Sequence, residues 1–99
     1  MHFVIIGRDR PGEEDLRLKT RSAHRDYVHG THENIVLALA GPLLGPDGRT
    51  MTGSLLVVEA ENQEAVEQFS LEDPYRKVGL FAEVQIDAWN WVTGNPNEK

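Results

Sequence analysis

The hydrophobic and polar positions along the chain follow two periods, one typical of strands and one typical of helices. Residues 2–6, 35–39 and 54–59 are short apolar runs rich in β-branched side chains, which predicts three strands with largely buried surfaces. Residues 80–91 instead alternate apolar and polar side chains, as expected of a strand with one covered face. The pattern therefore predicts four strands.

Helical spacing appears in two segments between these strands. The first helix is predicted to begin in the acidic turn 13–15 and to end at Gly30, because acidic residues favour a helix start and glycine a helix end. Its buried stripe is predicted to consist of Leu16, Thr20, Ala23 and Tyr27. Asn62 is expected to cap the second helix. That helix has a predicted stripe of Ala65, Val66 and Phe69.

The order of elements is β-α-β-β-α-β, which predicts an α+β, ferredoxin-like fold in a single domain over residues 1–92, with a loose tail at 93–99. In this topology the second strand lies at an edge of the sheet. Residues 35–39 are too apolar for an exposed edge, since such an edge invites uncontrolled pairing. A second copy of the chain is the simplest cover, so we predict a homodimer or a larger oligomer.

Composition excludes several classes of function. The 99 residues contain no cysteine, which rules out disulfides, thiolate nucleophiles and thiolate metal sites. A formal net charge of −6 argues against nucleic acid as a partner. No apolar run approaches a membrane span, and the N-terminus lacks a signal-peptide pattern, so we expect a cytoplasmic protein without a membrane partner.

Candidate chemistry begins in the first predicted helix, where Arg17, Arg21, His24 and Val28 lie along one flank of the stripe. His24 is expected at the boundary between core and cleft. Arg21 beside it suggests a binding site for an anion, because a guanidinium can hold a carboxylate or phenolate through two hydrogen bonds. For Arg17 we favour a solvated position, paired with an acid such as Glu13.

Asp73 opens the turn Asp73-Pro74-Tyr75 in the second half of the chain. Aspartate at a helix cap followed by proline is a common helix start, and that role suffices to explain Asp73. It leaves room for a second role, because a carboxylate at a helix start can also hold a histidine tautomer. An imidazole and a carboxylate from distant segments are the usual minimum for proton transfer, so we predict that His24 and Asp73 lie within hydrogen-bonding reach.

Other candidate sites have less support. A three-histidine metal site could be drawn from His24, His29 and His32, but their spacing matches no reliable motif, and we predict no metal and no cofactor. Ser54 lacks the context of a nucleophilic serine. Trp89 and Trp91 share a strand face and are expected to serve packing or an interface.

Taken together, these residues resemble the YCII-related family of small proteins. The matching segments run in order along nearly the whole chain: Phe3-Val4-Ile5, Asp9-Arg10-Pro11-Gly12, Arg21-Ser22-Ala23-His24, Gly41-Pro42-Leu43-Leu44, Gly53-Ser54-Leu55, Asp73-Pro74-Tyr75, Gly79-Leu80-Phe81 and Ala88-Trp89-Asn90. The resemblance implies a ferredoxin-like subunit that pairs as a dimeric α+β barrel. It also implies a His-Asp active site at His24 and Asp73.

The sequence thus predicts a metal-independent, enzyme-like dimer. His24 would act as general base or acid, oriented by Asp73, in elimination, isomerisation or lactone-type chemistry on a small, oxygenated and anionic ring compound. Candidate substrate-binding residues are Arg21, Ser54 and Tyr75. Two alternatives stay open: an accessory dimer that binds a small ligand without turnover, and a purely structural dimer module.

Overall fold

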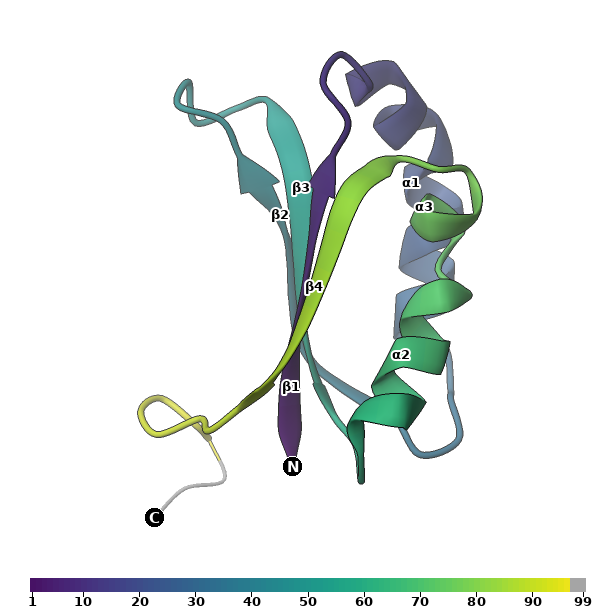
Figure 1. Cartoon of the computed structure of the whole chain (residues 1–99). Coiled ribbons are helices and arrows are strands. Elements are labelled where there is room, and N and C mark those ends of the chain that lie inside the picture. Colours follow the sequence, from purple (N-terminus) through teal and green to yellow (C-terminus); the bar gives the residue numbers. More distant parts are fainter. Residues whose placement is uncertain (97–99) are drawn as a thin grey trace.

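A computed structural model describes residues 1–96 as a four-stranded sheet with helices on one side (Figure 1). In chain order the elements are β1 (His2–Asp9), α1 (Glu14–His29), β2 (Val36–Leu44), β3 (Met51–Glu59), α2 (Gln63–Leu71), α3 (Pro74–Lys77) and β4 (Phe81–Trp89). None of the helices in the described part of the chain is long and apolar enough to cross a membrane. Residues 97–99 of the predicted loose tail lie outside the described residues.

The strands pair in the order β2-β3-β1-β4, and every pairing is antiparallel. Ile5 in β1 lies opposite Leu56 in β3 and Ile86 in β4, so apolar side chains from three strands meet on the helix side. The first and third strands are central, as the ferredoxin-like topology requires. The predicted order of elements is therefore confirmed.

The buried face of α1 differs from the predicted stripe. Its buried residues are Arg17, Thr20, His24 and Val28, whereas Ala23 is exposed. The helix is thus turned by about one residue from the orientation that hydrophobicity alone favoured. The reason is that Arg17 and His24 both find polar partners beneath the helix, which offsets the cost of burying them.

Strand β2 is longer than predicted and carries an irregularity. It continues through Gly41 and Pro42, with Pro42 opposite Ser54; proline is tolerated there because β2 is an edge strand. The register shifts between Leu37 and Leu39. As a result Leu37 packs against the core, while Leu39 is 45% exposed.

The sheet face opposite the helices has no cover within residues 1–96 (Figure 1). Apolar side chains on this side include Val4 and Ile6 of β1, which are half-buried, and Leu39 of β2. The rings of Trp89 and Trp91 stack with centroids 5.7 Å apart near the end of β4. The predicted need for a covering partner therefore stands, and the dimer itself remains a prediction.

Candidate active site

A cavity of about 230 Å³ lies between α1 and the edge of the sheet formed by β2 and β3. Small-ligand sites in proteins commonly measure about 300–1,000 Å³, so this cavity is slightly below that range and suits a small compound. The residues that line it are Arg17, Arg21, His24, Arg25, Val28, His29, Ala40, Gly41, Pro42, Met51, Ser54 and Tyr75. Four of the five predicted site residues line the cavity: Arg21, His24, Ser54 and Tyr75. The fifth, Asp73, does not line it but contacts His24.

His24 and Asp73 form a hydrogen bond although 49 positions separate them. Nδ1 of His24 lies 2.8 Å from Oδ1 of Asp73, and the two side chains are only 10% and 6% exposed. Since an ionised carboxylate only accepts, the proton of this bond belongs to Nδ1. The second nitrogen, Nε2, has no hydrogen-bond partner among the described residues and belongs to a side chain that lines the cavity. The predicted contact is confirmed.

Asp73 performs a second task at the same time. Its backbone is extended, at φ −62° and ψ 128°, and its Oδ1 accepts a hydrogen bond of 2.9 Å from the backbone N–H of Tyr75. It therefore caps α3, with Pro74 in the first helical position, as the sequence predicted. The cap fixes the carboxylate against the backbone, which in turn fixes where His24 can point.

Tyr75 lies flat against His24, with ring centroids 4.0 Å apart and an angle of 18° between the planes. The residue is 1% exposed, and its hydroxyl has no hydrogen-bond partner within residues 1–96. Burial raises the pKa of Tyr75, and the charge of Asp73 adds to this, while Arg17 and Arg21 oppose it. The phenol is therefore a proton donor at neutral pH.

Phe81 supports Tyr75 from the other side of the site. The two rings meet edge to face with centroids 5.8 Å apart. Phe81 also lies across Gly7 of β1, where a Cβ atom would come within 2.6 Å of the Phe81 ring. Glycine at this position thus leaves room for the ring that holds Tyr75 in place.

Arg17 is part of this site, contrary to the solvated position favoured from the sequence. Its guanidinium donates to both carboxylate oxygens of Asp9, at 2.6 and 2.8 Å, and to Oγ of Ser54 at 2.9 Å. It also lies over the ring of Tyr75, 4.5 Å from the centroid. Glu13, the acid proposed as its partner, pairs with Arg10 instead. The expectation failed because nothing local links position 17 to Asp9 at the end of a strand.

The two remaining predicted binding residues, Ser54 and Arg21, differ in their burial and in their hydrogen-bond partners. Ser54 is buried and its Oγ accepts from Arg17, so the Ser54 hydroxyl keeps its proton for a ligand. Arg21 is exposed at the cavity and forms no ion pair in the described part of the chain. Its guanidinium is therefore available to an anion. The sequence analysis did not assign Asp9, Arg25 or His29 to this site. Helical spacing from Arg21 is a signal for Arg25 and His29, whereas no local signal points to Asp9 at the end of β1.

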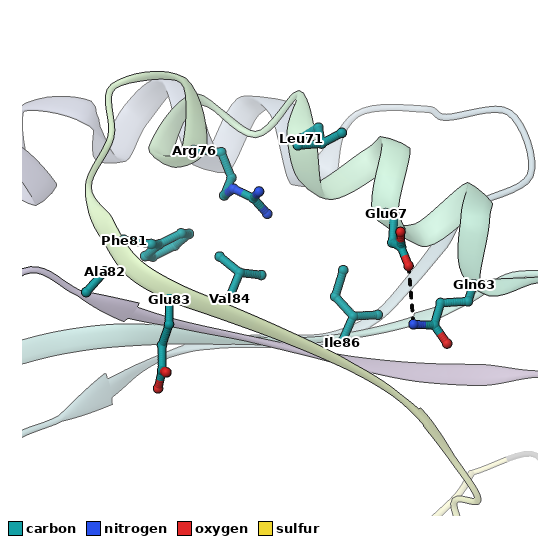
Figure 2. Close-up of a pocket in the computed structure, with 9 residues that line it drawn as sticks. All are labelled: Gln63, Glu67, Leu71, Arg76, Phe81, Ala82, Glu83, Val84 and Ile86. Atoms are coloured by element: carbon teal, nitrogen blue, oxygen red, sulfur yellow. Dashed lines mark hydrogen bonds between the residues drawn. The ribbon is translucent and has the colours of Figure 1, made fainter.

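A larger hollow of about 430 Å³ lies elsewhere, between α2, α3 and β4 (Figure 2). Val84 and Ile86 of β4 point into it from below, and Arg76 points into it from the helix side. Glu67 accepts a 3.3 Å hydrogen bond from Gln63 at its rim. This hollow contains no histidine and none of the predicted site residues. We therefore place the candidate active site at the smaller cavity.

Groups of three or more side chains suited to hold a metal ion do not occur within residues 1–96. His32 lies apart from His24: it packs edge-on against Phe69 and contacts the carbonyl oxygen of Tyr27 at 2.6 Å. His2 packs against Trp91 on the opposite side of the sheet. Of the three histidines that the sequence raised as metal ligands, His24 and His29 both line the cavity, while His32 lies apart from them.

Comparison with known proteins places this geometry in context. A model of the YCII-related domain matches residues 1–90. The protein YciI of Escherichia coli is 30% identical over 97 residues, covering 93% of this chain and 99% of that protein. An uncharacterized protein of Haemophilus influenzae is 29% identical over the same coverage.

Solved structures give the same picture. The 5-chloro-2-hydroxyhydroquinone dehydrochlorinase of Burkholderia phenoliruptrix, solved with 2,5-dihydroxybenzoquinone, matches with a TM-score of 0.78 and 35% identity, over 91% of this chain and 94% of that one. An antibiotic biosynthesis monooxygenase matches with a TM-score of 0.53 and 12% identity, over 93% and 99%, which supports the fold alone. These likenesses confirm the predicted fold class, a ferredoxin-like subunit of the dimeric α+β barrel type.

Proposed function

Because the chain belongs to the YCII-related family, we propose that it is a small homodimeric enzyme that uses the His24–Asp73 pair for acid/base chemistry. Its membership confirms the family predicted from the sequence segments. The substrate we propose is a small, oxygenated and anionic ring compound, and the reaction is an elimination, an isomerisation or lactone-type chemistry. The observation that carries the proposal is the 2.8 Å bond between His24 and Asp73 at the wall of the cavity.

The direction of that bond determines what His24 can do. Asp73 holds the proton on Nδ1, so the lone pair of Nε2 is available to a substrate. Nε2 can take a proton from a ring O–H or C–H, and the electron pair left behind moves into the ring. In an elimination an anionic group then leaves with its own bonding electrons, and the imidazolium returns its proton to water or to product. The Asp73 carboxylate stabilises the imidazolium between these steps.

The other residues supply binding and orientation. Arg21 has a free guanidinium at the cavity, suited to a phenolate or carboxylate oxygen. The hydroxyls of Ser54 and Tyr75 are both able to donate, because Ser54 already accepts from Arg17 and Tyr75 stays protonated. Two donors and a guanidinium around a histidine suit a ring with several oxygens.

The solved dehydrochlorinase supports an enzymatic role and the substrate class. It is 35% identical, and its name states the removal of chloride and a proton from a chlorinated hydroxyhydroquinone. The bound 2,5-dihydroxybenzoquinone in that structure is a small oxygenated ring. We carry over the class of compound and the type of reaction, with the residues of this chain in the roles given above.

A homodimer is part of the proposal because the open sheet face needs a cover. Val36 and Leu39 of β2, which are 61 and 45% exposed, lie on the open face together with the half-buried residues Val4 and Ile6. Leaving such a surface in water costs roughly 25 cal/mol for each Å² of apolar area. Two sheets packed face to face would remove this cost in both subunits.

The test begins with 5-chloro-2-hydroxyhydroquinone and a panel of hydroxylated ring acids, with product analysis and chloride release as readouts. His24→Gln should abolish turnover of any compound that the wild-type protein converts, while His32→Gln, the same change at a histidine outside the cavity, should retain it. Turnover that survives in His24→Gln would overturn the acid/base proposal. Saturable binding without any product would favour the accessory, ligand-binding alternative.

A further inference from the structure

The cavity wall formed by α1 carries more positive charge than the proposed chemistry uses. Arg25 and His29 follow Arg21 at intervals of four residues, which places the three on one row of the helix. All three line the cavity together with Arg17 and His24. None of the residues that line the cavity is an aspartate or a glutamate, although the whole protein has a net charge of −6. The cavity is thus locally cationic in an acidic protein.

The hydrogen-bond donors in this row are not used by internal partners. Arg17 is fully engaged by Asp9, whereas Arg25 and His29 form no ion pair or side-chain hydrogen bond within the described part of the chain. Asp26 is the carboxylate near them: it lines a second hollow along α1 together with Arg21, Arg25 and His29, but it forms no ion pair with them. The donors of Arg25 and His29 are therefore available to a ligand in the cavity.

Burial shows where this row lies relative to the reacting group. Arg17 and His24 are buried, while Arg21, Arg25 and His29 are exposed, so the row lies at the mouth. At 1.5 Å of rise per residue, Arg21 and His29 are about 12 Å apart along the helix axis. A ring held beside Tyr75 and His24 by Arg21 cannot also contact the far end of the row. A charged substituent on the ring is needed to reach the nearer part of the row, at Arg25.

We infer that the substrate carries a separate carboxylate, in addition to its ring oxygens, and that Arg25 and His29 bind it at the mouth of the cavity. This inference rests on the proposed function and specifies its substrate class. A planar guanidinium matches a carboxylate through two parallel hydrogen bonds, and the facing wall of Ala40, Gly41 and Pro42 offers no competing charge. Arg25 and His29 thus determine specificity without touching the reacting atoms.

The experiment compares two ligands that differ only in charge, 2,5-dihydroxybenzoate and its neutral amide, 2,5-dihydroxybenzamide. Affinities are measured by titration calorimetry on the full chain at low and at physiological salt. The acid should bind about five- to tenfold more tightly than the amide, as expected for a partly exposed charge-assisted contact. Arg25→Gln should remove this preference and leave the affinity for the amide unchanged, and His29→Gln should reduce it. Arg49→Gln, which removes the same charge from the β2–β3 turn, should retain it in full.

Each outcome separates this inference from the proposed function. Equal affinities for acid and amide, or a preference that persists in Arg25→Gln, would overturn the carboxylate inference. If the affinities for both compounds still fell in Tyr75→Leu, the compounds would be bound in the proposed cavity, and the site would stand without this specificity. If neither affinity changed in Tyr75→Leu, both compounds would bind elsewhere and the proposed function would fail as well. Lack of binding of the acid at millimolar concentration would count against both.

Discussion

The ring of Tyr75 stacks on the imidazole of His24 at a centroid distance of 4.0 Å, and the backbone N–H of Tyr75 donates to the carboxylate that holds the same imidazole. One residue therefore fixes both the plane and the partner of His24. The stacking and the hydroxyl of Tyr75 have different consequences, which two substitutions can separate.

Tyr75→Phe should keep the stacked ring and remove only the hydroxyl. We expect the affinity for 2,5-dihydroxybenzamide to fall about two- to tenfold, the range for one hydrogen bond, with the NMR signals of His24 almost unmoved. Tyr75→Leu should shift the His24 signals as well, because the flat contact is lost. Equal His24 shifts in the two variants would show that the ring does not position the imidazole.

Asp73→Asn should separate the capping role of Asp73 from its role toward His24. Asparagine is an equally good helix cap, so the free energy of unfolding should change little. Turnover should fall about 100-fold or more, because the amide does not stabilise the imidazolium as a carboxylate does. Asp73→Ala should add the loss of the cap, about 0.5–2 kcal/mol. An active Asp73→Asn protein would reduce Asp73 to a helix cap.

Asp9→Asn should be among the most destabilising single changes, because it leaves the buried charge of Arg17 without its carboxylate. Breaking one side of such a pair costs about 3–5 kcal/mol. The double variant Asp9→Leu/Arg17→Met should recover most of this loss in urea denaturation, since it removes both charges together. A single variant as stable as wild type would mean that the buried pair is not needed for the fold.

Leu39→Lys should shift the protein from dimer towards the 11.1 kDa monomer in sedimentation at micromolar concentration. Leu37, in the middle of the apolar run 35–39, packs against the core, so Leu37→Lys should destabilise the subunit itself. Leu71→Lys provides the control: Leu71 is 48% exposed but lies on α2, in the helix layer. A wild-type protein that sediments only as a monomer would end the dimer proposal.

The free energy of unfolding should fall in alkali because Tyr27 ionises. Burial, and then the charges of Asp73 and Glu72, raise the pKa of Tyr27 from 10.0 to about 12. Because the unfolded chain releases this proton at lower pH than the folded chain, the contribution is complete below about pH 10 and is lost as pH rises to about 12. Urea midpoints measured across this window should decline, and less steeply in Tyr27→Phe. Identical slopes in the two proteins would contradict the assignment.

The amino-acid sequence was sufficient to predict the order of elements, the central and edge strands, and His24 and Asp73 as candidate partners. Apolar runs and the alternation of residues 80–91 depend on burial, which local spacing reports well. Asp73 was visible because its cap and the following Pro74 are local signals. His24 and Asp73 could be paired in advance because an imidazole and a carboxylate suit proton transfer and because the resemblance to the YCII-related family implies this pair; the folded chain then places the start of α3 beside α1.

Which face of α1 is buried and which residues share the cavity became apparent only in the folded chain. Hydrophobicity scores Arg17 and His24 as surface residues, yet both are buried, because Asp9, Ser54 and Asp73 from three other segments satisfy them. Likewise, the register shift in β2 turns Leu37 towards the core and leaves Leu39 on the exposed side. A polar side chain can be buried where the folded chain supplies a hydrogen-bond partner for it. The position of that partner depends on the tertiary structure and not on the residues next to the side chain in sequence.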